Sequence, residues 1–208
     1  MLKIGVMVSG GGTNLQAILD AMAGGSLPDC RIVTVVSSKP GTGALDRAEK
    51  AGIPTAVFSR RDYEDMDGYD AGVLRHMQGH GVQLIVLAGF LSMIGERLID
   101  AYPQAILNVH PSLIPSFCGK GYYGIIPHRK ALEYGVKVSG ATVHFVEADY
   151  DSGPIVFQKA VTVMEDDTPE TLQQRVMEEA EWILLPEAIR LYATGKLQVK
   201  GRHVKILP

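Results

Sequence analysis

Asn108 and His110 are the side chains of this chain best placed for chemistry. They stand two positions apart at the end of the apolar run 105–109, and on a strand this spacing puts both on the same face. Pro111 ends strand pairing because it has no N–H to donate. An amide and an imidazole held together at a strand end can polarise a carbonyl group and transfer protons. A buried Asn and His that only hydrogen-bond a neighbouring loop would give the same pattern.

A glycine-rich turn follows the first predicted strand. The apolar run 4–8 leads into Ser9-Gly10-Gly11-Gly12-Thr13-Asn14, and from Leu15 onward apolar residues recur at helical spacing. We expect Thr13 or Asn14 to cap this helix, whose free N–H groups and dipole would bind an anion. No Lys follows the glycines, which excludes a nucleoside-triphosphate loop, and Leu15 occupies the third glycine position of the dinucleotide fingerprint. A phosphate monoester fits best; a turn without a ligand is the alternative.

Strands and helices alternate through the first half of the chain. This order predicts an α/β fold with a doubly wound, mostly parallel sheet, Rossmann-like in its N-terminal half. In such sheets ligands bind beyond the carboxyl ends of the strands, where both the glycine turn and Asn108 with His110 would lie. After the first strand and helix, the expected elements are a strand at 32–36, a helix at 43–51, a strand at 55–58, a helix at 61–79 and a buried strand at 84–87.

Two loops could contact a ligand. The segment 88–94 is unusually apolar for a loop and suggests a groove for a flat aromatic ligand, although it could instead pack on its own core. The segment 116–124 carries three glycines and three aromatic residues, which is typical of a lid, and a plain surface loop is equally compatible with it.

The second half of the chain combines a helix at 128–134 with strands at 138–146 and 155–163, which predicts an antiparallel extension of the sheet. His144 lies on the first of these strands, and the acidic turn 147–154 between them contains Asp151. Thr168-Pro169-Glu170 is a strong helix start. We expect Pro186 to bend or break this helix, and 197–199 with 203–206 to form a hairpin. The predicted buried stripe of the helix is Leu172, Val176, Ala180, Ile183 and Leu184.

Composition narrows the class of protein. A chain of 208 residues, with 46% hydrophobic and 21% charged residues, favours one globular domain, residues 1–208, with a phosphate-binding half at 1–100 and a catalytic half at 101–208. The net charge of −3 and the absence of basic runs argue against nucleic acid as a partner. The sequence contains neither a membrane-length apolar run nor a signal peptide, so we expect a cytoplasmic protein that does not bind membranes. Cys30 and Cys118 are isolated, which favours reduced thiols.

A metal site is not expected. His110, His128 and His144 are separated by 18 and 16 positions, and these spacings match no pattern of metal ligands. A histidine on a strand, such as His144, is also more often a structural residue than a ligand.

Three motifs resemble one family. Asn108-Val109-His110-Pro111-Ser112-Leu113-Ile114-Pro115, followed by Asp151-Ser152-Gly153-Pro154 and preceded by the glycine turn at 9–14, resembles the folate-dependent phosphoribosylglycinamide formyltransferase family over nearly the whole chain. The resemblance implies transfer of the formyl group from 10-formyltetrahydrofolate to the amine of N1-(5-phospho-D-ribosyl)glycinamide (glycinamide ribonucleotide) in purine synthesis, without a metal. The resemblance does not decide whether the protein is a monomer or a homodimer.

The resemblance also implies roles for individual residues. Asn108, His110 and Asp151 would be catalytic, and His144 would support them. The substrate phosphate would bind at Gly12, Thr13 and Asn14, and Glu181 would bind the ribose hydroxyls. The folate would contact Leu87, Phe90, Leu91, Ser92, Met93, Ile94, Asn108, Glu147, Ala148, Asp149 and Asp151.

The implied mechanism needs stabilisation of a negative oxygen. The amine attacks the formyl carbon, and protonated His110 with the Asn108 amide would stabilise the charge that develops. Asp151 would raise the pKa of His110 and relay a proton through a water. The nearest alternative is a formyltetrahydrofolate deformylase with the same three residues. A formyltransferase acting on a tRNA and a non-enzymatic nucleotide sensor are further alternatives.

Overall fold

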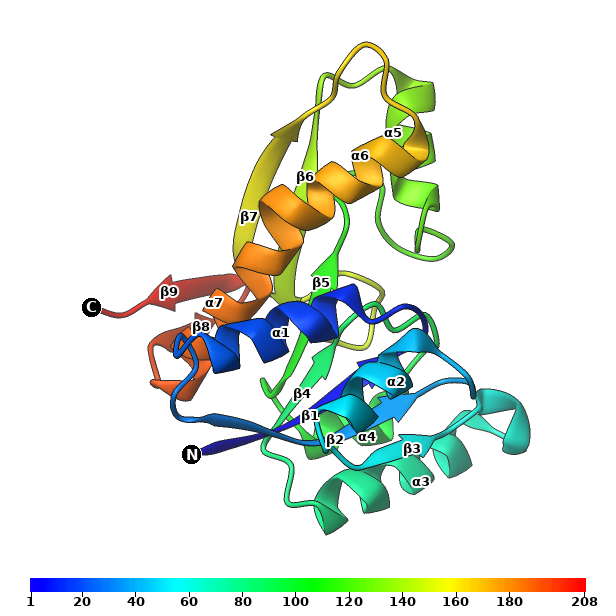
Figure 1. Cartoon of the computed structure of the whole chain (residues 1–208), viewed down its shortest axis with the longest axis vertical. Coiled ribbons are helices and arrows are strands. Elements are labelled where there is room, and N and C mark those ends of the chain that lie inside the picture. Colours follow the sequence, from blue (N-terminus) through cyan, green and yellow to red (C-terminus); the bar gives the residue numbers. More distant parts are fainter. The chain divides into compact units, whose positions relative to one another are not determined.

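The computed structural model describes residues 1–208, which form two compact units, Met1–Leu107 and Asn108–Pro208 (Figure 1). The division falls inside strand β5 (Ile106–His110), so this strand begins in the first unit and ends in the second. The single domain over 1–208, with halves at 1–100 and 101–208, stays a prediction.

The first unit alternates strands and helices, as the sequence predicts. Its strands lie in the order β3-β2-β1-β4, and the pairs β3–β2, β2–β1 and β1–β4 are all parallel. Strand β4 is buried along its whole length, as expected for a central strand covered on both faces. Before β5 the elements are β1 (Leu2–Val8), α1 (Thr13–Ala23), β2 (Cys30–Ser37), α2 (Gly43–Lys50), β3 (Thr55–Val57), the 3₁₀ turn η1 (Arg60–Asp62), α3 (Met66–Gly79), β4 (Leu84–Leu87) and α4 (Glu96–Ala101).

The second unit contains the antiparallel part of the fold. Its strands follow the order β5-β6-β7-β9-β8, with β6–β7 and β8–β9 antiparallel. The predicted α/β class, with mostly parallel strands and an antiparallel C-terminal extension, is therefore confirmed. After β5 the elements are α5 (Ile126–Tyr134), β6 (Val138–Phe145), β7 (Ile155–Thr162), α6 (Pro169–Val176), the π turn η2 (Met177–Glu181), α7 (Trp182–Ala193), β8 (Leu197–Lys200) and β9 (His203–Ile206).

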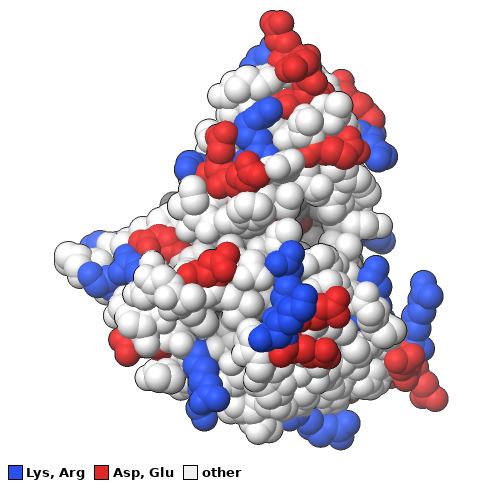
Figure 2. Space-filling view, in the orientation of Figure 1, with Lys and Arg blue, Asp and Glu red and all other residues white.

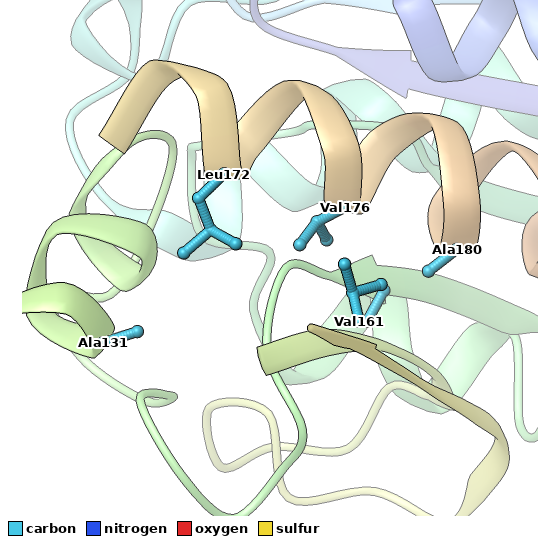
Figure 3. Packing of buried hydrophobic residues seen from close by; sticks show 6 residues of the cluster. Ala131, Val161, Leu172, Val176 and Ala180 are labelled. Atoms are coloured by element: carbon cyan, nitrogen blue, oxygen red, sulfur yellow. The ribbon is translucent and has the colours of Figure 1, made fainter. Parts of the chain in front are cut away.

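The core of the second unit lies between α6 and the β6–β7 pair, and α5 contributes to it. Leu172, Val176 and Ala180 are spaced four residues apart and face the same way, towards Val161 on β7 (Figure 3). Thr168 caps α6 by accepting a hydrogen bond from the N–H of Thr171 at 3.2 Å, so the predicted helix start is confirmed.

The continuation of this helix differs from the prediction. Ile183 was expected in the buried stripe but is 51% exposed, whereas Leu185 is fully buried. The cause is the π turn Met177–Glu181, which fits one extra residue into a turn and so rotates every later side chain by about 100°. Pro186 does not break the helix, since α7 continues from Trp182 to Ala193.

Two helices also begin differently from the prediction. The N-cap of α1 is Gly12, in a left-handed conformation with φ 76°, so neither Thr13 nor Asn14 is the cap. Helix α3 begins at Met66 and not near residue 61, because the side chain of Asp65 accepts a hydrogen bond from Gly68 N at 2.7 Å and caps it there.

The surface carries both signs of charge. On the face drawn in Figure 2, Lys and Arg side chains are interspersed with Asp and Glu side chains. None of the helices combines the length and the apolar character needed to span a bilayer.

Candidate active site

Asp151 joins the polar side chains of the second unit into one cluster. Its Oδ2 lies 3.5 Å from His110 Nδ1, and its Oδ1 lies 3.7 Å from His144 Nε2. Asn108 Nδ2 lies 3.1 Å from the same His144 nitrogen. The strand ends of β5 and β6 and the turn after β6 therefore bring Asn108, His110, His144 and Asp151 together.

The turn that carries Asp151 is fixed by its own backbone. Asp151 has φ 48°, a left-handed conformation that is uncommon for a residue other than glycine. Phe145 N donates to Pro154 O at 2.9 Å across the base of the turn. A Cβ at Gly153 would collide with Phe145 O, so only glycine fits there. This close pairing holds Asp151 beside the strands.

Asn108 is oriented by His144. Nδ1 of His144 lies 2.8 Å from the carbonyl oxygen of Phe145, which can only accept, so Nδ1 carries the hydrogen. In the neutral ring Nε2 is then an acceptor, and it receives a hydrogen bond from the Asn108 amide. The amide nitrogen of Asn108 has a second hydrogen that can be donated to another group.

His110 is held between a carbonyl and a carboxylate. Its Nε2 donates to Phe117 O at 3.0 Å, and Nδ1 faces Asp151. Burial lowers the pKa of His110 below its ordinary value, and this effect outweighs the neighbouring Asp151, which raises it. The expectation that Asp151 raises the pKa of His110 is therefore correct. The net change of this pKa is nevertheless downward, so the neutral ring is favoured over the protonated ring that the family resemblance implied.

The carboxyl of Asp151 is anionic at neutral pH. Burial alone would raise its pKa, but the N–H of Gly119, which donates to Oδ2 at 2.8 Å, and the positive charge that His144 and His110 carry when they are protonated together lower it. Phe117 and Gly119 belong to the segment 116–124. This predicted lid therefore contacts both His110 and Asp151 through its backbone.

His128 is a buried histidine that the sequence placed on a helix at 128–134 without assigning it a role. Its side chain, on α5, is fully buried, and neither ring nitrogen has a hydrogen-bond partner. Burial, together with the positive charge that His110 carries when it is protonated, lowers the pKa of His128 to about 4. No sequence signal other than its position on the inner face of a short helix could have identified it.

The glycine turn in the first unit joins β1 to α1. Gly12 is buried, and a Cβ at this position would lie 2.7 Å from both Cα and Cβ of Ala44 on α2. Gly10 and Gly11 have open space on the side where a Cβ would stand. Without a side-chain cap on α1, the backbone of this turn is the part of the helix start that can bind an anion.

The apolar segment after β4 is partly exposed. Leu87, the last residue of β4, and Ile94 are buried, Phe90 and Ser92 are half-buried, and Leu91 and Met93 expose 50% and 43% of their surface. The main-chain N–H of Leu91 donates to Ser9 Oγ at 2.9 Å. The loop therefore exposes apolar side chains, while its backbone is hydrogen-bonded to Ser9 directly after β1.

The remaining predicted site residues lie in the second unit. Glu181 ends the π turn and is 5% exposed. Glu147, Ala148 and Asp149 are exposed in the turn that carries Asp151. No group of three or more His, Cys, Asp or Glu side chains is arranged to hold a metal ion.

The chain is similar to proteins that are named for purine biosynthesis or for formyl transfer. The chain is 39% identical to the trifunctional purine biosynthetic protein adenosine-3 of Chironomus tentans over 96% of its length, but spans 14% of that protein. It is 42% identical to the chloroplastic phosphoribosylglycinamide formyltransferase of Arabidopsis thaliana over 85% of the chain and 61% of that protein. The chain thus spans less than two thirds of these relatives.

Solved structures cover the chain more completely. Glycinamide ribonucleotide transformylase 1 of Symbiobacterium toebii matches with a TM-score of 0.94 and 44% identity, over 100% of this chain and 95% of that one. A formyltetrahydrofolate deformylase of Pseudomonas syringae matches with a TM-score of 0.88 and 26% identity, but the chain covers 66% of it. Residues 2–189 match the sequence profile described as formyl transferase, and the chain belongs to this family.

Proposed function

We propose that this chain transfers a formyl group from 10-formyltetrahydrofolate to the amine of phosphoribosylglycinamide in purine biosynthesis. The observation that carries the proposal is the contact of Asp151 with both His110 and His144, the second of which orients Asn108. Relatives named for this reaction and a transformylase structure similar over the whole chain support it.

The catalytic roles follow from the bonding of each group. Attack of the amine on the formyl carbon places a negative charge on the formyl oxygen, and the second amide hydrogen of Asn108 can bind that oxygen. Removing one such donor typically costs a few kcal/mol of transition-state stabilisation. His144 contributes by holding the amide in the donating orientation.

Proton transfer is assigned to His110 and Asp151. The attacking nitrogen must lose a proton, and the folate nitrogen must gain one as its bond to the formyl carbon breaks. In the neutral ring Nδ1 of His110 carries no hydrogen and faces the carboxylate at 3.5 Å, so a proton taken up there from the attacking nitrogen is stabilised by Asp151. The lowered pKa of His110 keeps this position free to accept. The same proton is then given to the folate nitrogen as its bond to the formyl carbon breaks, which returns His110 to the neutral form.

Substrate contacts are proposed for the other predicted residues. Gly12, Thr13 and Asn14 would bind the phosphate, and Glu181 would bind the ribose hydroxyls. The folate would contact the apolar segment, which comprises Leu87, Phe90, Leu91, Ser92, Met93 and Ile94, and the turn with Glu147, Ala148, Asp149 and Asp151, together with Asn108. We further propose a cytoplasmic protein of one domain, a monomer or homodimer, whose substrates are small molecules.

A coupled assay tests the proposal. The purified chain is incubated with 10-formyltetrahydrofolate, with and without phosphoribosylglycinamide, while folate deformylation and the formylated product are both measured. We expect folate turnover only when the acceptor is present, with one product formed per formyl group lost. Equal formyl loss without the acceptor would instead identify a deformylase.

A further inference from the structure

We infer that Asp70 and Ser9, neither of which belongs to the apolar loop 88–95, are positioning residues that fix this loop for the flat ring of the folate. The inference rests on the proposed function, because that function assigns the folate to the loop. Every contact that carries it lies within the first unit.

Asp70 lies on helix α3 and holds the C-terminal end of the loop in place. Its side chain is 1% exposed, and its Oδ1 accepts a hydrogen bond from Gly95 N at 2.9 Å. Its Oδ2 accepts from Leu98 N at 3.3 Å. Gly95 is the N-cap residue of α4 and has no side chain to cap it. The buried carboxylate therefore supplies the cap that α4 lacks, where the helix dipole favours a negative charge.

The loop approaches this carboxylate too closely for a side chain. A Cβ at Gly95 would lie 2.5 Å from Asp70 Oδ2 and 2.6 Å from Met66 Cγ. The backbone of Gly95 thus packs directly against the carboxyl group of Asp70. A shift of Asp70 by even a fraction of an ångström would move the end of the loop.

Ser9 holds the middle of the loop. Its hydroxyl oxygen accepts from Leu91 N at 2.9 Å and lies 2.7 Å from Ser38 Oγ, at the ends of β1 and β2. Ser9 is buried and is the first residue of the glycine turn 9–14, directly before Gly10. The backbone of the loop is therefore tied at Leu91 and at Gly95, on either side of the exposed side chain of Met93.

This arrangement reduces the cost of binding a flat apolar ligand. Leu91 and Met93 expose about half of their surface while the main chain beneath them is hydrogen-bonded to rigid elements. A loop that is already ordered does not lose conformational entropy when the ligand binds. Loss of the hydrogen bond to Ser9 or of the hydrogen bond to Asp70 should therefore lower the affinity for the folate more than it lowers the rate of the chemical step.

Each substitution has a matched control, on the same helix for Asp70 and at the end of the neighbouring strand for Ser9. Asp70→Asn replaces one accepting oxygen by a donating NH₂ group, and its control Asp67→Asn removes the exposed pair with Arg97 at 2.6 Å while leaving the loop bonded. Ser9→Ala removes the hydroxyl that binds Leu91, and its control Ser38→Ala leaves that bond in place.

The measurements are the KM for 10-formyltetrahydrofolate, the KM for phosphoribosylglycinamide, kcat, and the Kd of tetrahydrofolate as a binding probe. In Asp70→Asn and Ser9→Ala we expect a roughly tenfold rise in the folate KM and in the tetrahydrofolate Kd, as for loss of one buried hydrogen bond. The KM for phosphoribosylglycinamide and kcat at saturating folate should stay within about twofold of wild type. Both controls should match wild type.

The outcomes separate the inference from the proposed function. Folded variants whose folate constants equal those of their controls, or whose two KM values rise together, would overturn the positioning role. If wild type neither transfers the formyl group nor binds tetrahydrofolate, the proposed function fails. Should Asp70→Asn fail to fold, the Ser9→Ala and Ser38→Ala pair decides the inference alone.

Discussion

His128 should make the second unit less stable in weak acid. Its ring is fully buried with no hydrogen-bond partner, and burial lowers its pKa from 6.5 to about 4. Between these two values the unfolded chain binds a proton at this residue and the folded chain does not. Stability must therefore fall as the pH falls through this window.

The size of the effect follows from the shift. The full shift is worth about 3 kcal/mol once the pH is below the folded pKa, and roughly 2 kcal/mol is lost between about pH 7.5 and about pH 5. His128→Gln cannot take up this proton. The variant should therefore lose about 2 kcal/mol less than wild type over the same interval, whatever its stability at the higher pH.

Urea unfolding at the two pH values measures this difference. Trp182, the only tryptophan, lies in the same unit as His128 and reports its unfolding by fluorescence. Other titrating groups, including the buried His110, are present in both proteins and cancel to first order in the comparison. His203→Gln, on the exposed face of β9, is the control and should behave as wild type. Equal losses in wild type and His128→Gln would refute the reasoning.

Further predictions concern the proposed catalytic and phosphate sites. His110→Ala should lower kcat at least about 100-fold without loss of the fold, as checked by steady-state kinetics and circular dichroism; a rate near wild type would remove His110 from the mechanism. Gly11→Ala places a methyl group in open space, so it should not lower thermal stability but should raise the KM for phosphoribosylglycinamide, whereas the equally open Gly79→Ala, at the end of α3, should leave this KM unchanged and should not lower thermal stability either. Gly12→Ala should lower Tm, because its φ of 76° disfavours a side chain and the Cβ would meet α2; an unchanged Tm would contradict the observed packing.

The sequence predicted the strands well, and the structure brings Asn108, His110, His144 and Asp151 together, although their roles in catalysis stay a prediction. Strand β4 was predicted at 84–87 and is Leu84–Leu87, because an apolar run of this length is too short for a helix and fits a buried strand. The spacing of Asn108 and His110 identified a site that Asp151 completes from the turn after β6. The family resemblance supplied that long-range pairing, since strand periodicity by itself does not reveal which turn meets which strand.

What the sequence did not predict depends on backbone detail. The exposure of Ile183 follows from a single extra residue in the π turn, and apolar spacing alone assumes a regular helix. The contacts of Phe117 O with His110 and of Gly119 N with Asp151 involve main-chain atoms, which carry no sequence signature. Nothing in the sequence singled out Asp70, and only its burial and its hydrogen bond from Gly95 N indicate a role.

The central claim is that the carboxylate of Asp151, acting with His110, drives formyl transfer to an amine. Single-turnover transfer of a labelled formyl group from 10-formyltetrahydrofolate to phosphoribosylglycinamide, measured in wild type and in Asp151→Asn with both ligands saturating, tests it most directly. We predict label in the acceptor for wild type and a rate at least about 100-fold lower in the variant, with binding of both ligands retained. A variant that transfers label at nearly the wild-type rate would contradict the claim.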